Sequence, residues 1–500
     1  MPNVSLDDLT PNARDLAEQS LTWSERRWDP EGALLGSKIV GTPGESRLGV
    51  RNSVWTAVGF LLRNADGDTE RASRTIDAII DQQFDEPGMP YHGTYFRYVG
   101  EPHPPGKDAV MWRDFDPNWR QFIGLGLATI LEEFEHRLEH AQVKRIEQSL
   151  ELAVIGEPPD RCPPRYTNIA LMKAALNVWV GRRLGKQPFV DYGESFGKDV
   201  YELFKQTDAY DEYNSPTYYG TNFYALGFWR RYLEGSSIRE MGLYMEAALW
   251  RDTIRYYHAG LKNLCGPFSR SYGMDMTRYT ALVSLAFWLA FGREQTPFPE
   301  VDQQPGNRLG IDAEFAYGPC MAIFDSIAPD DVRDDVATFS GPRSIEKTIT
   351  LDPRRIATAW LDDAYTLGAE STSDYSCRSY QHHAVTVHWR CPNGEIGWLR
   401  LKHIGPIDAH AEQSRIHFTA PASADYKARD GDATTFTFVV YVPDVSESQF
   451  EGSIWALPGM TVSVGTSLDA PSISKEGETV EITYTTSSDS ADFNLQFTTA

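Results

Sequence analysis

The spacing of apolar residues changes once along the chain, from a helical period to a strand period, and this change restricts the possible folds most strongly. From residue 8 to about residue 325, apolar side chains recur every three or four residues, as in 116–134. Further along, segments such as 385–389 and 434–442 alternate or are rich in β-branched residues. The sequence therefore predicts an all-α region followed by an all-β region.

Amphipathic helices are expected to alternate with helices that are apolar nearly all round. The segment 167–180 is of the second kind, which predicts a helix buried on most of its sides. Such alternation is typical of the inner and outer helices of an α/α toroid, although no sequence repeat can be aligned. The expected helices span residues 13–28, 49–63, 69–84, 116–134, 141–155, 167–180, 192–206, 216–234, 239–262, 275–292 and 313–328.

A segment rich in Pro, Gly and Gln, residues 296–310, has the composition of a linker. We therefore expect two domains. Residues 1–310 would form an α/α toroid, either incomplete or like an (α/α)6 barrel, and residues 311–500 an antiparallel β-sandwich. The expected strands are 385–389, 396–401, 415–418, 434–442, 480–484 and 493–497.

Charge and composition exclude several classes of partner. The 47 basic and 70 acidic side chains give a net charge of −23, which argues against binding to nucleic acid or to an anionic membrane. No apolar run is long enough to span a bilayer. The five cysteines include no CxxC pair, so neither a zinc site nor a disulfide framework is expected, and we predict no metal and no cofactor. The oligomeric state stays open.

The first residues contain neither a basic segment nor an apolar segment of the kind found in signal peptides. A cytoplasmic location is the expectation for the sequence as written. A secreted protein whose leader has been removed is the alternative.

Five segments between the expected helices contain more polar and aromatic side chains than turns require. On one face of a toroid such loops would converge on the central cleft, and loops on a rigid scaffold often carry function. Aromatic faces with polar edges also suit sugar rings. These segments are 90–97, 113–120, 165–168, 211–222 and 266–275.

The all-α then all-β order, together with Asn168, Tyr218 and Arg270 near helix ends, resembles the polysaccharide lyases that join an α/α toroid to a β-sandwich. Chondroitin AC, hyaluronate and alginate lyases are examples. The segment 211–222 is similar in character to the loop that carries a His and a Tyr in those enzymes, but it contains no His.

The resemblance implies β-elimination on a uronate glycan without a metal. Asn168 and Arg270 would neutralise the carboxylate, which makes the C5 proton acidic. His92, or a tyrosine kept anionic by arginine, would remove that proton, and Tyr218 or Tyr219 would protonate the leaving oxygen. The predicted substrate-binding residues are Arg97, Asn118, Arg120, Tyr166, Glu212, Asn214, Tyr219 and Tyr272.

An anionic substrate requires local positive charge in an acidic protein, and five arginines are expected to supply it: Arg97, Arg113, Arg120, Arg165 and Arg270. Two alternatives remain. A glycoside hydrolase on the same toroid would use paired carboxylates, from Asp114 and Asp116 with Asp211 or Glu212. A glycan-binding protein without turnover would need only the aromatic and hydrogen-bonding side chains.

Overall fold

The computed structural model describes residues 4–38, 46–301, 311–372, 381–421, 434–486 and 490–499. Two compact units account for the fold, and each is described by itself. Unit 1 comprises Met1–Leu203, Tyr218–Ala247 and Arg278–Ala328, and unit 2 comprises Phe204–Thr217, Ala248–Thr277 and Pro329–Ala500. The division of the chain near residue 310 that the sequence suggested stays a prediction.

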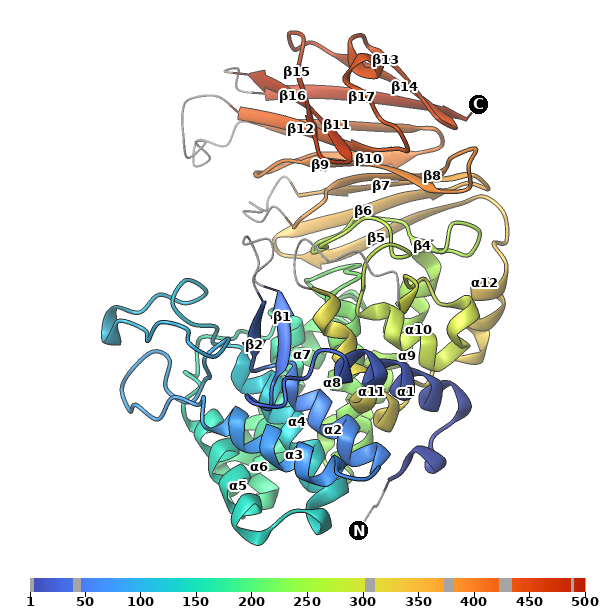
Figure 1. Ribbon diagram of the computed structural model, residues 1–500. Helices are drawn as coiled ribbons and strands as arrows, with labels where there is room; N and C mark the ends of the chain where they lie inside the picture. The colour runs from blue at the N-terminus through green and yellow to red at the C-terminus, as the bar shows by residue number, and fades with distance from the viewer. Residues whose placement is uncertain are drawn as a thin grey trace. The chain divides into compact units, whose positions relative to one another are not determined.

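Unit 1 is helical, as predicted (Figure 1). Among its described residues, β1 (Leu35–Lys38) and β2 (Ser46–Gly49) pair as a small antiparallel sheet. Two further helices, α7 (Gln187–Lys205) and α9 (Ser237–Tyr256), have residues in both units. The remaining principal helices are α1 (Pro11–Glu25), α2 (Ser53–Arg63), α3 (Asp68–Ile80), α4 (Trp119–Phe134), α5 (His140–Ile155), α6 (Thr167–Leu184), α8 (Tyr218–Tyr232), α10 (Val283–Phe291) and α11 (Gly318–Phe324).

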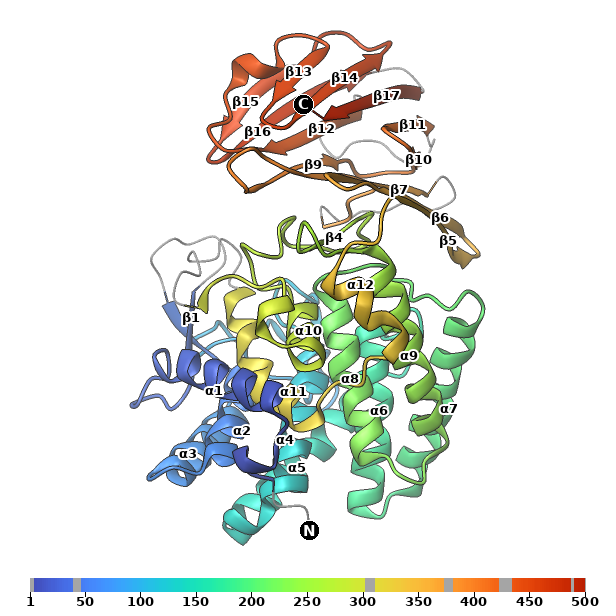
Figure 2. The ribbon, with the colours of Figure 1, turned by 90° about the vertical axis from the view of Figure 1, so that its right-hand side faces the viewer.

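Five helices of unit 1 form a closed inner ring. Helix α2 contacts α4, α4 contacts α6, α6 contacts α8, α8 contacts α11, and α11 returns to α2. Four helices pack outside this ring. Helix α3 packs against α2, and α5 packs against α4 and α6. Helix α1 packs against α11, and α10 packs against α8. Figure 2 shows the helices from a second direction. The concentric arrangement follows from the alternation of apolar and amphipathic segments, because the inner helices are buried on most sides. Among the outer helices, α10 is an exception, since its residues Val283–Leu289 are all buried.

The inner helices begin at the same end of the ring. Trp55 near the start of α2 lies against Phe122 near the start of α4, with ring centroids 6.5 Å apart. The residues that precede α4 and α6, Asn118 and Tyr166, share a hydrogen bond of 2.8 Å. Gly126 permits close packing between α4 and α2, since a Cβ atom there would lie 2.6 Å from the Val54 side chain.

One predicted helix begins later than expected. The sequence pattern placed its start at residue 275, but α10 begins at Val283. The Asn263 side chain bonds to the backbone of Met274 and Met276, and Asp275 accepts a hydrogen bond from the Thr277 backbone. These side chains satisfy the backbone in a non-helical conformation, which competes with helix formation.

Most strands of unit 2 form one antiparallel 13-stranded sheet, and β3 (Tyr257–His258) pairs with β4 (Asn263–Leu264) in a separate two-stranded sheet. The central order is β11-β10-β7-β8-β9-β12, with β17, β14 and β13 beyond β11 and with β16 and β15 beyond β12. Strands β5 and β6 pair alongside β7. The strands are β5 (Arg343–Leu351), β6 (Arg354–Leu361), β7 (Tyr365–Ser371), β8 (Val385–Arg390), β9 (Ile396–Lys402), β10 (Asp408–Glu412), β11 (Arg415–Pro421), β12 (Thr434–Tyr441), β13 (Ile454–Leu457), β14 (Met460–Thr466), β15 (Ser472–Glu476), β16 (Thr479–Thr486) and β17 (Ser490–Thr499).

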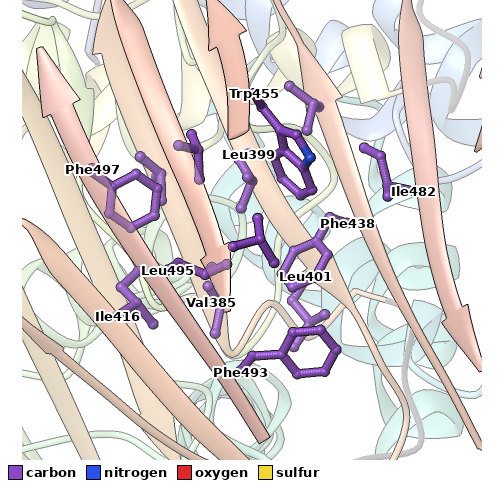
Figure 3. Packing of buried hydrophobic residues seen from close by; sticks show 14 of the residues in the cluster. Val385, Leu399, Leu401, Ile416, Phe438, Trp455, Ile482, Phe493, Leu495 and Phe497 are labelled. Atoms are coloured by element: carbon purple, nitrogen blue, oxygen red, sulfur yellow. The ribbon is translucent and has the colours of Figure 1, made fainter. Parts of the chain in front are cut away.

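The two ends of this sheet pack against each other face to face. Phe438 of β12 contacts Phe493 of β17, with ring centroids 5.4 Å apart, and Tyr484 of β16 contacts the same ring at 5.2 Å. Figure 3 shows this core. The predicted antiparallel β domain is confirmed, and its two layers belong to one continuous curled sheet. Within the described residues, no helix is long and apolar enough to cross a bilayer.

Candidate active site

Asparagines occupy the start of each inner helix from α2 to α8. Asn52 and Asn118 directly precede α2 and α4, yet neither side chain caps its helix. Instead, Asn118 donates from Nδ2 to the Tyr166 hydroxyl and accepts at Oδ1 from Arg161, at 2.8 Å in each case. Asn168 is the second residue of α6 and fully buried, so it lies inside the helix and not at its cap. Amide groups are therefore concentrated at one end of the ring.

Helix α8 directs one stripe of side chains towards α6. Trp229 on this stripe donates from its indole nitrogen to the Leu171 carbonyl of α6, at 2.9 Å. Asn222 lies two turns earlier and Tyr218 three turns earlier on the same stripe. Asn222 is fully buried, and neither its Nδ2 nor its Oδ1 has a hydrogen-bond partner among the residues that the structure describes. A buried amide without partners costs stability, which points to a polar ligand at this position.

Arg51 lies at the start of α2 among aromatic rings. Its guanidinium carbon is 4.9 Å from the centre of the Phe122 ring and 5.7 Å from that of Trp119. Beneath it, Tyr317 stacks on Trp55 with ring centroids 3.5 Å apart. The guanidinium also lies 3.8 Å from the Glu314 carboxylate, in the short helix η6 (Ile311–Tyr317) that precedes α11. The site thus places the Arg51 guanidinium next to several aromatic rings.

Two carboxyl groups near Arg51 bind protons more tightly than usual. Burial raises the pKa of Glu314 to about 7, and the positive charge of Arg51 opposes this rise only in part. Burial also raises the pKa of Asp116, against the hydrogen bond from the Asn118 backbone and the charge of Arg51. Such shifts are common at catalytic carboxyl groups.

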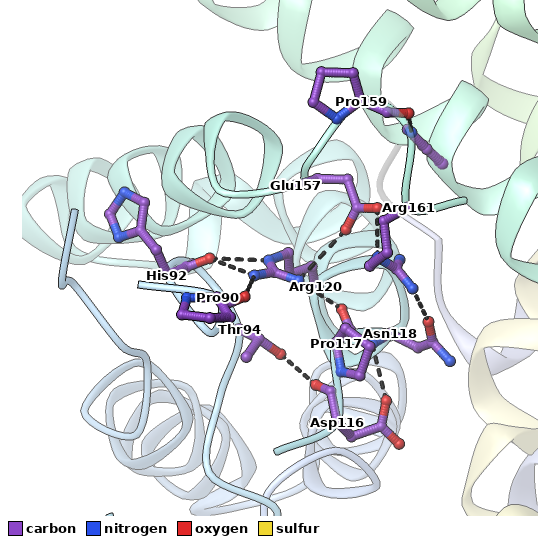
Figure 4. A network of polar contacts seen from close by, with 12 residues as sticks. Pro90, His92, Thr94, Asp116, Pro117, Asn118, Arg120, Glu157, Pro159 and Arg161 are labelled. Atoms are coloured by element: carbon purple, nitrogen blue, oxygen red, sulfur yellow. Dashed lines mark hydrogen bonds and ion pairs between the residues drawn. The ribbon is translucent and has the colours of Figure 1, made fainter. Parts of the chain in front are cut away.

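A buried network supports the first turn of α4 (Figure 4). The fully buried guanidinium of Arg120 donates to the carbonyl oxygens of His92, Pro90 and Pro117 and lies 3.4 Å from Glu157. These contacts occupy its donors within the protein. Arg120, predicted to bind substrate, instead fixes the loop 90–97 to α4.

The other predicted residues of this loop make local contacts. His92 accepts at Nδ1 a hydrogen bond of 3.1 Å from the Glu86 backbone, and 14% of its side chain is exposed. Arg97 pairs with Glu101 and donates to the carbonyl oxygens of Trp112 and Arg113.

Four predicted residues lie in unit 2. Arg270 donates from Nε to the Gln381 side chain at 2.7 Å, and its guanidinium is 3.7 Å from Glu212. Asn214 donates to the carbonyl oxygens of Cys265 and Pro267, which ties the 211–217 segment to the 263–271 segment. Tyr272 follows on the latter segment and is half-buried. These side chains therefore shape the two loops within unit 2.

A buried charge cluster in unit 2 was missed from the sequence. Arg355 of β6 donates to Glu370 of β7 at 2.7 Å and to the Asp211 carbonyl at 2.8 Å, and His382 lies 3.5 Å from Glu370. Burial would raise the pKa of Glu370, but the charges of Arg355 and His382 prevail and lower it to about 2. The cluster anchors the 211–217 segment to the sheet.

Unit 1 thus holds Tyr218, Tyr219, Asn118, Tyr166 and Asn168 at the beginnings of the inner helices, and His92, Arg97 and Arg120 at or near the loop 90–97. Unit 2 holds Glu212, Asn214, Arg270 and Tyr272. The arginines expected to attract an anion are largely committed elsewhere: Arg113, for example, is 65% exposed and pairs with Asp114. Reasoning from the sequence missed Arg51, Glu314 and Asn222. The dipeptide Arg51–Asn52 just before a strongly apolar helix was the available signal for Arg51.

Several solved structures are similar to this chain, all at low sequence identity. Heparinase III has 8% identity and a TM-score of 0.44, over 100% of this chain and 87% of that protein. A glycosyl hydrolase of family 88 from Bacteroides vulgatus has 10% identity and a TM-score of 0.39, over 62% and 99%. The chondroitin AC lyase of Streptomyces coelicolor A3, solved with chondroitin sulphate, has 11% identity and a TM-score of 0.38, over 98% and 97%. Similarity at this level says nothing about the reaction of this chain.

No curated protein matches the sequence significantly. Two family models do match. One, described as "Domain of unknown function (DUF8770)", covers residues 342–499. The other, described as "Domain of unknown function (DUF8769)", covers residues 14–326, well over half of the sequence, and the chain therefore belongs to the DUF8769 family.

Proposed function

We propose that the chain is a carbohydrate-active enzyme that binds a uronate-containing glycan where the inner helices of unit 1 begin, and cleaves it by metal-independent β-elimination. One observation carries this proposal. The fully buried Asn222 amide, without a partner among the described residues, lies one helical turn from Tyr218 on the stripe of α8 that meets α6. An amide and a phenol on one stripe supply a group that holds a carboxylate beside a group that transfers a proton.

In β-elimination a base removes the C5 proton, the C5–H electrons form a C4=C5 double bond, and the C4–O4 bond breaks. The leaving O4 then takes a proton. Amide donors such as Asn168 and Asn222 would stabilise the charge that develops on the carboxylate when C5 loses its proton. Tyr218 would protonate O4. The roles assigned to His92 and Arg270 from the resemblance remain predictions.

The test is ultraviolet absorbance during incubation with a panel of uronate glycans: alginate, glucuronan, hyaluronan, pectin and rhamnosyl-glucuronate gums. Elimination produces a conjugated C4=C5 uronate that absorbs, whereas hydrolysis does not. We expect absorbance to rise with at least one glycan and to stop rising in Tyr218→Phe. Tyr192→Phe is the matched control, because Tyr192 is a tyrosine of α7 that is more exposed than Tyr218. The Tyr192→Phe variant should retain activity.

A second candidate, glycoside hydrolysis, is favoured by the two carboxyl groups beside Arg51. Glu314, with its pKa near 7, would act as the acid, and Asp116 would be the second carboxylate. New reducing ends without ultraviolet absorbance, lost in Asp116→Asn, would establish hydrolysis and reject elimination.

A further inference from the structure

The Arg51–Glu314 pair of unit 1 is a salt bridge without a direct hydrogen bond. The closest guanidinium nitrogen and carboxylate oxygen are 3.8 Å apart, beyond hydrogen-bonding distance. The Glu314 Oε2 atom is buried and has no hydrogen-bond partner among the described residues. Some 21% of the Arg51 side chain and 13% of the Glu314 side chain are exposed. Glu314 is therefore a weakly held counter-ion that a better-placed anion could replace, while the Nε atom of Arg51 donates to Asn52 Oδ1 at 2.9 Å.

The groups around Glu314 leave Arg51 as its main electrostatic partner. Tyr317 of the same element is fully buried, and burial holds its pKa well above the ordinary value, so it is neutral. Tyr224 of α8, which lies against Tyr317, is neutral for the same reason. Asp116, from the loop before α4, also interacts with the charge of Arg51, which opposes the burial that raises the pKa of Asp116. No second cation shares the Glu314 carboxylate among the described residues.

We propose that Arg51 binds the carboxylate of the uronate ligand and that Glu314 takes up a proton when the ligand binds. The ligand carboxylate then replaces Glu314 as the counter-ion of Arg51, so that binding is coupled to proton uptake. This inference rests on the proposed function, because it names the group that recognises the acidic sugar. A neutral Glu314 carboxyl would also donate its O–H to the incoming carboxylate. An ionised Glu314 would instead repel the ligand at short range.

The expected size of the coupling follows from the Glu314 pKa of about 7. A uronate carboxylate is ionised throughout the neutral range, so only Glu314 changes charge on binding. Wild-type protein should take up about 0.9 proton per ligand at pH 8 and about 0.1 at pH 6. Affinity should fall about tenfold between pH 6 and pH 8, since the neutral carboxyl becomes scarce.

Isothermal titration calorimetry with sodium glucuronate, in two buffers of different ionisation enthalpy, measures this uptake. Glucuronate has no substituent at O4 and cannot be eliminated, so the test does not depend on turnover. We expect Glu314→Gln to bind at pH 8 as tightly as wild-type protein does at pH 6, without proton uptake, and Arg51→Met to lose binding. Glu246→Gln is the matched control. Glu246 is also buried against an arginine, Arg230, but near the opposite end of α8, so its variant should keep the wild-type pH dependence.

Glucuronate binding without proton uptake, or a pH dependence that survives in Glu314→Gln, would overturn the inference, as would the absence of binding to wild-type protein. The proposed reaction is judged separately by ultraviolet absorbance. Elimination without proton-linked binding would reject the role of Glu314 alone. Proton-linked binding without elimination would support the Arg51–Glu314 site and reject the lyase.

Discussion

Replacing Asn222 with leucine should stabilise the protein while abolishing glycan binding. Leucine has nearly the shape of asparagine but needs no hydrogen bonds. Because the Asn222 amide is fully buried and both polar atoms lack partners among the described residues, folding desolvates them without compensation. The Asn222 side chain is therefore expected to reduce the stability of the protein in the absence of ligand and to contribute to binding when a ligand is present.

The magnitude follows from the desolvation of the orphaned amide. An unsatisfied buried polar group costs about 1–3 kcal/mol. Leucine also favours helix over asparagine by about 0.5 kcal/mol. We expect Asn222→Leu to raise the free energy of unfolding by about 2 kcal/mol, which corresponds to about 3 °C in Tm for a unit of this size.

Calorimetry and urea denaturation measure the change, and Asn177→Leu is the matched control. Asn177 is a buried asparagine of α6, but its Nδ2 donates to the Lys173 carbonyl at 2.9 Å. Both variants have the same difference in helix propensity, whereas only Asn177→Leu loses a hydrogen bond, so this variant should not become more stable. If Asn222→Leu proves no more stable than Asn177→Leu, the Asn222 amide is already satisfied and the main evidence for a ligand there is lost.

Two further predictions concern buried charges. Glu157→Gln leaves the buried guanidinium groups of Arg120 and Arg161 without their shared carboxylate and should reduce the free energy of unfolding by about 3–5 kcal/mol in urea. A loss below about 1 kcal/mol would mean that the carbonyl and amide contacts of the two arginines compensate their charge. Glu370 has a folded-state pKa of about 2, below its ordinary value of 4.5, so its contribution is complete above about pH 5 and disappears as the pH falls towards 2. Glu370→Gln should flatten this acid limb of the stability curve, and an unchanged limb would contradict the role assigned to Arg355.

Local sequence patterns predicted the principal helices and six of the thirteen strands of the large sheet, namely β8, β9, β11, β12, β16 and β17. The apolar spacing within 116–134 and 167–180 lies within single helices, so α4 and α6 could be predicted without knowledge of their neighbours. The late start of α10 could not, because the hydrogen bonds that Asn263 makes to Met274 and Met276 compete with the helix and depend on a turn of the chain. Two layers from one continuous sheet were likewise outside the reach of strand patterns.

The candidate site was predicted in part. Asn118, Tyr166, Asn168 and Tyr218 belong to segments whose polar density the sequence showed, and unit 1 places all four where inner helices begin. Arg120 misled the prediction because burial, which the sequence does not display, turns an apparent substrate-binding arginine into a structural one.

The sequence by itself determined where helices and strands form, because hydrophobic periodicity is a property of neighbouring residues. Only the tertiary structure decided which polar groups act together. Arg51 and Glu314 are far apart in the chain, and closure of the inner ring through α11 brings them within 3.8 Å. Burial there raises the pKa of Glu314 and leaves the Asn222 amide without partners among the described residues. Desolvation depends on the packing of the whole unit, and for that reason the chemistry of the site could not be read from any single segment.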